Sequence, residues 1–124
     1  MTWWIENGRW DAADPEVDAF VEANIASFAA WDLVIFLNHN PDSAEPFGRL
    51  VELLARHESD MRPAVDALAA SGVLVACEVE GVECYSLTPD EHTRRVLERF
   101  IHMASNRDHR LDFVRRVLQR ITDR

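Results

Sequence analysis

The stretch SGVLVACEVEGVECYSLTPDE, residues 71–91, decides the fold. Two runs of mainly β-branched and small residues surround Glu80-Gly81, a pattern typical of a hairpin with a two-residue turn. Gly72, just before the first run, favours the end of a helix. After the second run, Thr88-Pro89 predicts the start of another helix, with Thr88 as its cap and Pro89 at the first position. The sequence therefore predicts a β-hairpin held between two helices.

Helical patterns fill most of the chain before the hairpin. Asp14 followed by Pro15 predicts a helix start, and apolar residues then recur at three-and-four spacing, with a plausible break at Ser27. Two shorter helices are expected next, with Ser43 and Asp60 as their caps. A final helical pattern follows the hairpin.

Length and composition suit a single domain. The chain has 124 residues, 48% of them apolar, enough for an ordinary core. The longest apolar run, residues 33–37, is far too short for a membrane span. No basic segment with a long apolar run marks a signal peptide, so a cytoplasmic location is expected. The two cysteines would be reduced thiols in that compartment.

Charge is distributed unevenly. The net charge is −9, and all 13 basic residues are arginine. Residues 1–48 hold nine acids and one arginine, whereas residues 91–124 hold five acids and nine arginines. This balance excludes a general polyanion binder, so any nucleic-acid contact has to come from a local patch.

The order of these elements resembles a winged helix-turn-helix domain. The stretch FGRLVELLARHESDMRPAVDALAASGVLV resembles its second and third helices. The stretch VECYSLTPDE resembles the returning wing strand, which in MarR-like and PadR-like regulators commonly ends in the pattern aromatic-x-Leu-Thr-Pro. AAWDLVIFLNHNP resembles the first helix, so the likeness covers residues 28–91, about half of the chain. It implies a mostly α fold with a small β-hairpin, in which an N-terminal helix and a long C-terminal helix flank the winged core.

The resemblance implies a division of the single domain into three parts. Residues 1–26 form an N-terminal hairpin-like segment and helix, residues 27–90 the winged core, and residues 91–124 a C-terminal dimerisation helix. It also implies a DNA-binding transcriptional regulator that forms a homodimer. In such proteins the third helix enters the major groove and the wing touches the backbone or the minor groove.

Few residues suit that DNA contact. On the expected third helix only Arg62 is a good donor to a base or a phosphate, and Ser59 could donate to a phosphate. His57 lies just before this helix, while Arg49 and Arg56 on the second helix could reach the backbone. These five residues are the candidate DNA contacts.

The expected wing is acidic. Glu78, Glu80 and Glu83 stand where arginine or lysine would be expected, and the hairpin carries no arginine. Two interpretations of these acids are open: a solvated face, or a contact surface for a protein. The alternative function is therefore a winged-helix module that does not bind DNA, but binds a basic protein partner or mimics DNA.

The C-terminal pattern carries a coiled-coil-like seam. Its apolar or small positions are Leu97, Phe100, Ala104, Leu111, Val114, Leu118 and Ile121. Ser105-Asn106 could kink this helix or split it in two. We expect the seam to form the homodimer interface, unless the N-terminal helix covers it within one chain.

Cys77 and Cys84 are expected to face each other across the hairpin if Glu80-Gly81 is the turn. We interpret them as two buried reduced thiols, and a redox pair at the wing is the alternative. At the N-terminus, TWWIENGRWD contains Asn7-Gly8, which favours a tight turn. We expect this tryptophan-bearing segment to be ordered, with a disordered start as the alternative.

No pattern predicts catalysis. Nucleophilic motifs, a Gly-rich phosphate loop and framed carboxylate pairs are missing from the sequence, so we do not expect an enzyme. His102 and His109 lie seven residues apart, which is a weak metal signal. Surface histidines are the favoured interpretation, and no cofactor is expected.

Overall fold

The computed structural model describes residues 14–122. Its elements are, in chain order, α1 (Pro15–Asn24), α2 (Phe28–His39), β1 (Ala44–Glu45), α3 (Phe47–Leu54), α4 (Glu58–Ala70), β2 (Leu74–Val79), β3 (Val82–Leu87), α5 (Glu91–Ala104) and α6 (Arg107–Thr122). The N-terminal turn at Asn7-Gly8 and the tryptophans at positions 3, 4 and 10 lie outside the described residues.

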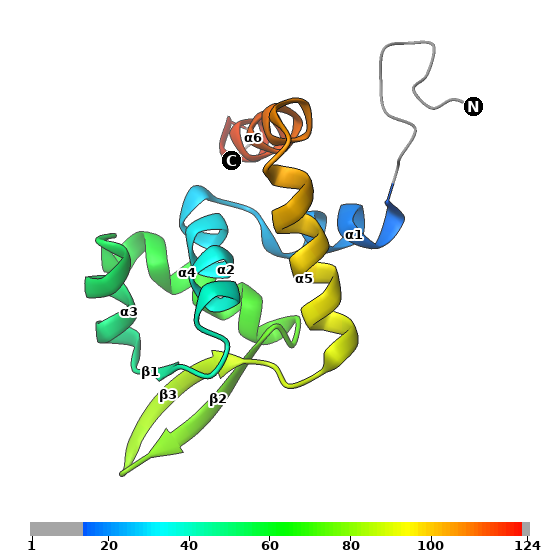
Figure 1. The fold of residues 1–124 in the computed structure, drawn as a ribbon. Helices are drawn as coiled ribbons and strands as arrows, with labels where there is room; N and C mark the ends of the chain where they lie inside the picture. Colours follow the sequence, from blue (N-terminus) through cyan, green and yellow to red (C-terminus); the bar gives the residue numbers. More distant parts are fainter. Residues whose placement is uncertain (1–13, 123–124) are drawn as a thin grey trace, which may run out of the picture.

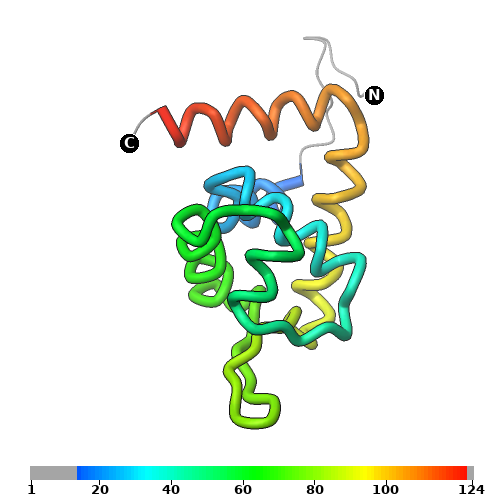
Figure 2. The backbone as a smooth tube through the Cα atoms, turned by 90° about the vertical axis from the view of Figure 1, so that its left-hand side faces the viewer, coloured from blue at the N-terminus to red at the C-terminus, as the bar shows by residue number. Residues whose placement is uncertain are grey.

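The fold is a winged helix, as the sequence predicts. Helices α2, α3 and α4 are followed by the β2–β3 hairpin, and the short β1 completes an antiparallel sheet in the order β1-β3-β2. Helix α5 runs back along this core beside α1, and α6 crosses at the far end of the molecule from the wing (Figure 1). Turned by 90°, the molecule shows the hairpin extending beyond the helical body (Figure 2).

Two predicted helix caps are confirmed. The Oδ1 atom of Asp14 accepts a hydrogen bond of 3.2 Å from the Val17 backbone N–H, with Pro15 at the first helical position. The Oγ atom of Ser27 accepts one of 3.1 Å from the Ala30 N–H. The break at Ser27 is thus a genuine helix boundary, and it separates α1 from α2.

The other three predicted caps are wrong. Ser43 precedes strand β1, and its hydroxyl donates to Glu45 (2.7 Å). Ala44 and Glu45 are held in the sheet by pairing with β3. Helix α3 therefore begins later than predicted, after Pro46. Asp60 lies inside α4, which begins one turn earlier than predicted, at Glu58.

The early start of α4 places Pro63 inside the helix. Proline has no backbone N–H, so the Ser59 carbonyl lacks its helical hydrogen-bond donor. Ser59 lies in the exposed first turn, where water can donate to this carbonyl instead. At the start of α5 the cap is Asp90, whose Oδ2 accepts from the Thr93 N–H (2.9 Å), while Thr88 accepts from the Asp90 N–H (3.1 Å). Thr88 therefore shapes the turn that leads into the helix.

Aromatic rings join the helices into one core. The ring of Phe100 on α5 lies 5.0 Å from Phe113 on α6, 5.6 Å from Trp31 on α2 and 5.7 Å from Phe20 on α1, measured between centroids. Offset and tilted contacts at these distances are the favourable arrangements of aromatic pairs. Four helices therefore meet at one side chain.

The C-terminal region forms two helices that meet at Ser105-Asn106. The Oδ1 atom of Asn106 accepts from the backbone N–H groups of Asp108 (3.0 Å) and His109 (3.2 Å), so asparagine caps α6. This bend turns Phe113 back onto Phe100 and buries Leu97 within the same chain. Leu97 and Phe100 consequently have no surface left for a second copy of the protein.

Backbone geometry confirms the predicted wing turn. Val79 pairs with Val82, and Glu80 and Gly81 between them adopt positive φ angles of 51° and 81°. Positive φ at both central residues is the requirement of a type I′ turn, the turn that matches the twist of a hairpin.

None of the helices in residues 14–122 is both long and apolar enough to cross a membrane alone, and α1 with α2 reaches that length and hydropathy only across a 119° bend.

The end of α3 makes a stability prediction. Ala55 adopts a left-handed conformation, with φ 53° and ψ 45°, which glycine adopts without steric cost. We expect Ala55→Gly to raise the free energy of unfolding by about 0.5–1 kcal/mol in urea denaturation. The matched control, Ala69→Gly in the last turn of α4, should lower it. A loss of stability in Ala55→Gly would contradict the prediction.

Candidate nucleic-acid interface

Helix α4 presents the surface that a winged helix offers to DNA. Met61, Val65 and Leu68 are fully buried, as the sequence analysis assumed, so they fix which side of the helix faces outward. The exposed side carries Ser59, Pro63 and several acids, and one cation. Any sequence recognition by α4 depends on that cation.

The cation is Arg62, whose side chain contacts Phe47 and Asp66. Its guanidinium carbon lies 3.8 Å from the centre of the Phe47 ring, and its Nη1 lies 3.5 Å from Asp66. A hydrogen bond with Tyr85 of β3 is the main reason that the pKa of Arg62 lies above its ordinary value, with Asp66 adding to it. The side chain is 47% exposed, so it is both positioned and accessible.

The other two candidate arginines differ in availability. Arg49 on α3 is half exposed and forms a 3.3 Å pair with Glu52, which is a weak surface pair. Arg56 donates twice to one carboxylate oxygen of Asp32 on α2, from Nε at 2.9 Å and from Nη2 at 2.5 Å. Arg56 therefore fastens α2 to the α3–α4 turn, and Arg49 stays accessible.

The two polar candidates before and within α4, His57 and Ser59, are exposed, and Ser59 lies on a different side of α4 from Arg62. His57 occupies the cap position of α4 without a side-chain cap bond. Ser59 borders a pocket on the side of α4 that faces α2, whereas Arg62 leans toward α3 and the wing. The structure thus does not gather the five candidates into one patch.

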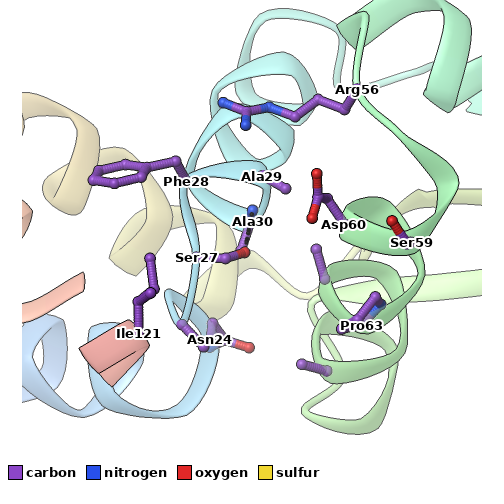
Figure 3. Close-up of a pocket in the computed structure, with 13 residues that line it drawn as sticks. Asn24, Ser27, Phe28, Ala29, Ala30, Arg56, Ser59, Asp60, Pro63 and Ile121 are labelled. Atoms are coloured by element: carbon purple, nitrogen blue, oxygen red, sulfur yellow. Dashed lines mark hydrogen bonds between the residues drawn. The ribbon is translucent and has the colours of Figure 1, made fainter. Parts of the chain in front are cut away.

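A pocket of about 210 Å³ lies between α2, α4 and the end of α6. In Figure 3, Ile121 closes one side and Pro63 the other, with Ser27 and Asn24 between them. The buried or half-buried polar side chains of this lining are already engaged: Asn24 with Ser71 (2.5 Å), Ser27 with Ala30, and Arg56 with Asp32. The buried part of the lining therefore offers shape and apolar surface, and the exposed Ser59 and Asp60 provide polar groups at its edge.

The two faces of the wing differ in chemistry. Register pairs Glu78 with Glu83 on the face that continues from the core-facing Tyr85, and Tyr85 donates to Glu83 at 3.2 Å. Cys77 pairs with Cys84 on the opposite face, together with Val75. The carboxylates of Glu78 and Glu83 lie directly opposite each other, so this face of the wing repels phosphate.

The cysteine pair has the predicted register, and both thiols are free in the structure. Cys84 is buried as predicted, whereas Cys77 is only partly buried because it lies on β2, the edge strand of the sheet. Positions counted from a two-residue turn make Cys77 and Cys84 a hydrogen-bonded pair, which is wide for a disulfide. Burial is the largest cause that raises the pKa of Cys84, followed by Cys77 and Glu45. A raised pKa keeps the thiol protonated and poorly nucleophilic, which favours the interpretation as two small apolar residues over the redox pair.

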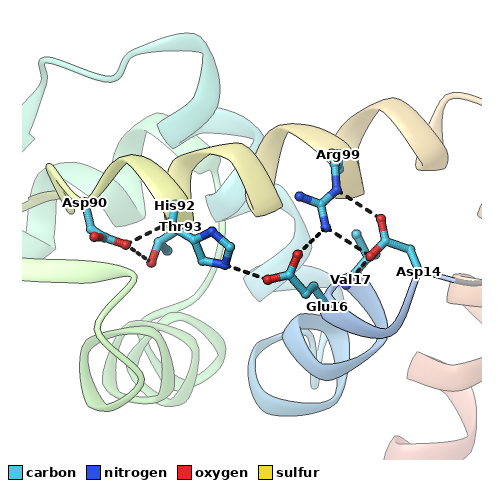
Figure 4. A network of polar contacts seen from close by, with 7 residues as sticks. All are labelled: Asp14, Glu16, Val17, Asp90, His92, Thr93 and Arg99. Atoms are coloured by element: carbon cyan, nitrogen blue, oxygen red, sulfur yellow. Dashed lines mark hydrogen bonds and ion pairs between the residues drawn. The ribbon is translucent and has the colours of Figure 1, made fainter.

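The arginines of the C-terminal region bind the acids of α1. Arg99 on α5 contacts Asp14 (3.0 Å) and Glu16 (2.9 Å), and His92 Nε2 lies 2.6 Å from the same Glu16 (Figure 4). The Arg99 guanidinium is the main cause that lowers the pKa of Asp14, and Arg99 followed by His92 lowers that of Glu16.

Helix α6 makes the same kind of contact with α1. Arg116 lies 3.1 Å from Asp18, and Arg120 donates to the backbone carbonyl of Glu22 at 2.7 Å. Sequence analysis of individual motifs missed these pairs. The signal was the opposite charge imbalance of the two ends of the chain, which reflects internal pairing more than a basic patch for a ligand.

Comparison with known proteins gives a likeness among solved structures. No protein-family model matches the sequence, and no curated protein matches it. Among solved structures, a MarR family transcriptional regulator from Silicibacter pomeroyi DSS-3 aligns with 23% identity and a TM-score of 0.49, over 79% of this chain and 69% of the regulator.

The α1–α5 pairs predict the acid stability of the fold. The ordinary pKa values of Asp14 and Glu16, 3.8 and 4.5, are both lowered in the folded protein. Their pairing with Arg99 therefore stabilises the fold fully when the pH is above the ordinary pKa values. This stabilisation is lost as the pH falls through the lower pKa values of the folded protein. Arg99→Met should lower the melting temperature at pH 6, with the difference from the parent protein vanishing near pH 2.

Arg95→Met is the matched control, because Arg95 pairs only with its helix neighbour Glu91 at 3.6 Å among the contacts described. Melting temperatures of the three proteins at intervals between about pH 2 and pH 7 provide the measurement. A constant difference between Arg99→Met and the parent across this range would contradict the electrostatic explanation.

Proposed function

We propose that this chain is a winged-helix transcriptional regulator that binds duplex DNA as a homodimer. The observation that carries the proposal is Arg62, a half-exposed guanidinium on the helix that this fold presents to the major groove. Phe47 and Asp66 restrain its side chain before any ligand arrives, which reduces the entropy lost on binding. A bidentate arginine is the commonest specific reader of guanine.

Arg49 is the most available backbone contact, since Arg56 is bound to Asp32. With so few cations on each subunit, the affinity of a monomer for DNA is expected to be low. Two-fold symmetry doubles the number of contacts, so a dimer is needed for useful affinity. The dimer belongs to the proposal for this reason.

The surface for a dimer is the outer side of α6. Leu111, Leu118 and Ile121 are exposed there, and Val114 between them is half-buried. Phe113 and Val117 on the inner side belong to the chain's own core. Of the predicted seam, the part on α6 is available to a second copy, and Ala104 at the bend is half-buried.

DNA binding is tested with a random duplex library at about 50 mM salt, followed by titration of the selected sequence. Arg62→Ala should reduce the preference for the selected sequence by about 1–3 kcal/mol for the lost base contact. Because few phosphates are neutralised, the log–log salt slope of the dimer should be no steeper than about −4.

Arg95→Ala on α5 is the control, since it removes the same charge from a surface away from α4. Circular dichroism confirms that each variant is folded. If the parent protein enriches no sequence and shows no anisotropy change with any duplex at low salt, the DNA proposal is wrong.

The dimer makes a separate prediction. Leu118→Glu places a charge in the middle of the exposed α6 side, so it should convert a dimer into a monomer by light scattering at tens of micromolar. The control is Leu53→Glu on α3, which is similarly exposed but lies outside α6. A parent protein that is already monomeric at this concentration would refute the dimer.

The charge of the same surface favours a second candidate function. Residues 47–87 carry three arginines against seven acids: Glu52, Glu58, Asp60, Asp66, Glu78, Glu80 and Glu83. Such a surface repels phosphate and attracts cations. It would suit a protein-interaction module that binds a basic partner or mimics DNA. In that case charge reversal of Glu78 and Glu80 abolishes binding, and Arg62→Ala leaves it unchanged.

A further inference from the structure

The outward side of the wing is apolar, where a solvated hairpin would carry polar side chains. Alternation along the β2–β3 pair places Val75, Cys77, Val79, Val82, the buried Cys84 and the half-buried Ser86 on one side, which we call the outer wing face. Val75, Val79 and Val82 are 38%, 45% and 49% exposed. They are three of the seven exposed large apolar side chains in residues 14–122, so the outer wing face is a concentrated patch.

Strand β2 also has a free edge. The sheet order β1-β3-β2 leaves one side of β2 without a neighbouring strand. Counting from the two-residue turn, Val75, Cys77 and Val79 bond to β3, so the backbone groups of Ala76 and Glu78 point away from the sheet. Within residues 14–122, no backbone hydrogen bond outside the β2–β3 ladder reaches either residue. An unpaired edge of this kind is a template for another strand.

The charged side chains of the hairpin itself are all negative. Glu78 and Glu83 lie on the opposite side of the hairpin from the valines, and Glu80 stands at the turn. Residues 74–87 contain no arginine, lysine or histidine. A strand added to β2 would therefore place one set of alternate side chains beside valines and the other set beside Glu78.

We propose that the free edge and outer wing face bind an extended protein segment in which aliphatic and basic side chains alternate. Its backbone pairs with Ala76 and Glu78, its aliphatic side chains extend the valine surface, and its basic side chains lie beside Glu78. This is recognition by strand addition, in which the backbone provides affinity and alternate side chains provide specificity. It is independent of DNA binding by α4.

Charge favours a basic protein segment over two other occupants, DNA and a second copy of this chain. DNA would bring phosphates against three carboxylates. A second copy would bring an identical acidic hairpin from a chain that itself carries a net charge of −9. A basic strand is the occupant for which the edge, the valines and the acids are all favourable.

The experiment uses the full chain, kept reduced, with the synthetic peptide KVKVKVK as the probe. We expect saturable binding below about 1 mM, with the largest amide chemical-shift changes at Ala76 and Glu78. The peptide EVEVEVE should not bind, because its acids would face Glu78. KVKVKVK methylated on its lysine amides should not bind either, since those amides are the ones that pair with β2.

The protein variants test the same contacts. Val79→Thr combined with Val82→Thr keeps the β-branched shape and should weaken binding about tenfold. Glu78→Gln should weaken it and flatten its salt dependence. Leu53→Ala, an exposed apolar side chain on α3, is the matched control and should leave the affinity unchanged.

Several outcomes would overturn the proposal: no saturable binding, equal binding of the lysine and glutamate peptides, or binding that survives amide methylation. If the valine substitutions lower the solution mass of the protein, the outer wing face joins two copies and the proposal is wrong. DNA titration of the same double variant separates peptide binding by the wing from DNA binding by α4. If the wing does not contact DNA, the double variant should keep its DNA affinity and lose peptide affinity.

Discussion

The contact between Phe100 and three other rings is the interaction on which the arrangement of helices depends. Phe20, Trp31 and Phe113 come from α1, α2 and α6, and each lies within 6 Å of the Phe100 centroid. Because α2 begins the winged core and α6 ends the described chain, this cluster fixes the core relative to the flanking helices. A large-to-small substitution at such a centre removes contacts with all three neighbours at once.

Polar contacts add specificity to this packing. Arg99 and Arg116 hold α1 through its acids, and Arg56 holds α2 to the α3–α4 turn. The cations that would give an α-helical regulator its basic surface are thus used inside the chain. On the side of the molecule formed by α3, α4 and the wing, the accessible cations are Arg62 and Arg49, beside an acidic wing, so function there has to come from few cations or from contacts that need none.

Much of the fold followed from local sequence rules. The hairpin and its register were predictable because Glu80-Gly81 allows one turn type, and Asp14 and Ser27 cap helices through contacts within three residues. Ser43 and Asp60 misled because strand pairing and α4 packing, both long-range, outweigh a good cap. The candidate site was only partly predictable. The contact of Arg62 with Phe47 joins α4 to α3, and no local pattern reports such a contact.

The turn at Glu80-Gly81 keeps two unlike surfaces of the wing apart. Side chains alternate with a period of two, so slippage of one strand by a single residue would move every side chain of that strand to the other side. Glutamates would then lie among valines, and neither an apolar surface nor an acidic one would survive. The length of this turn is therefore under tighter constraint than its amino acids, and a one-residue insertion there should be far less tolerable than a substitution.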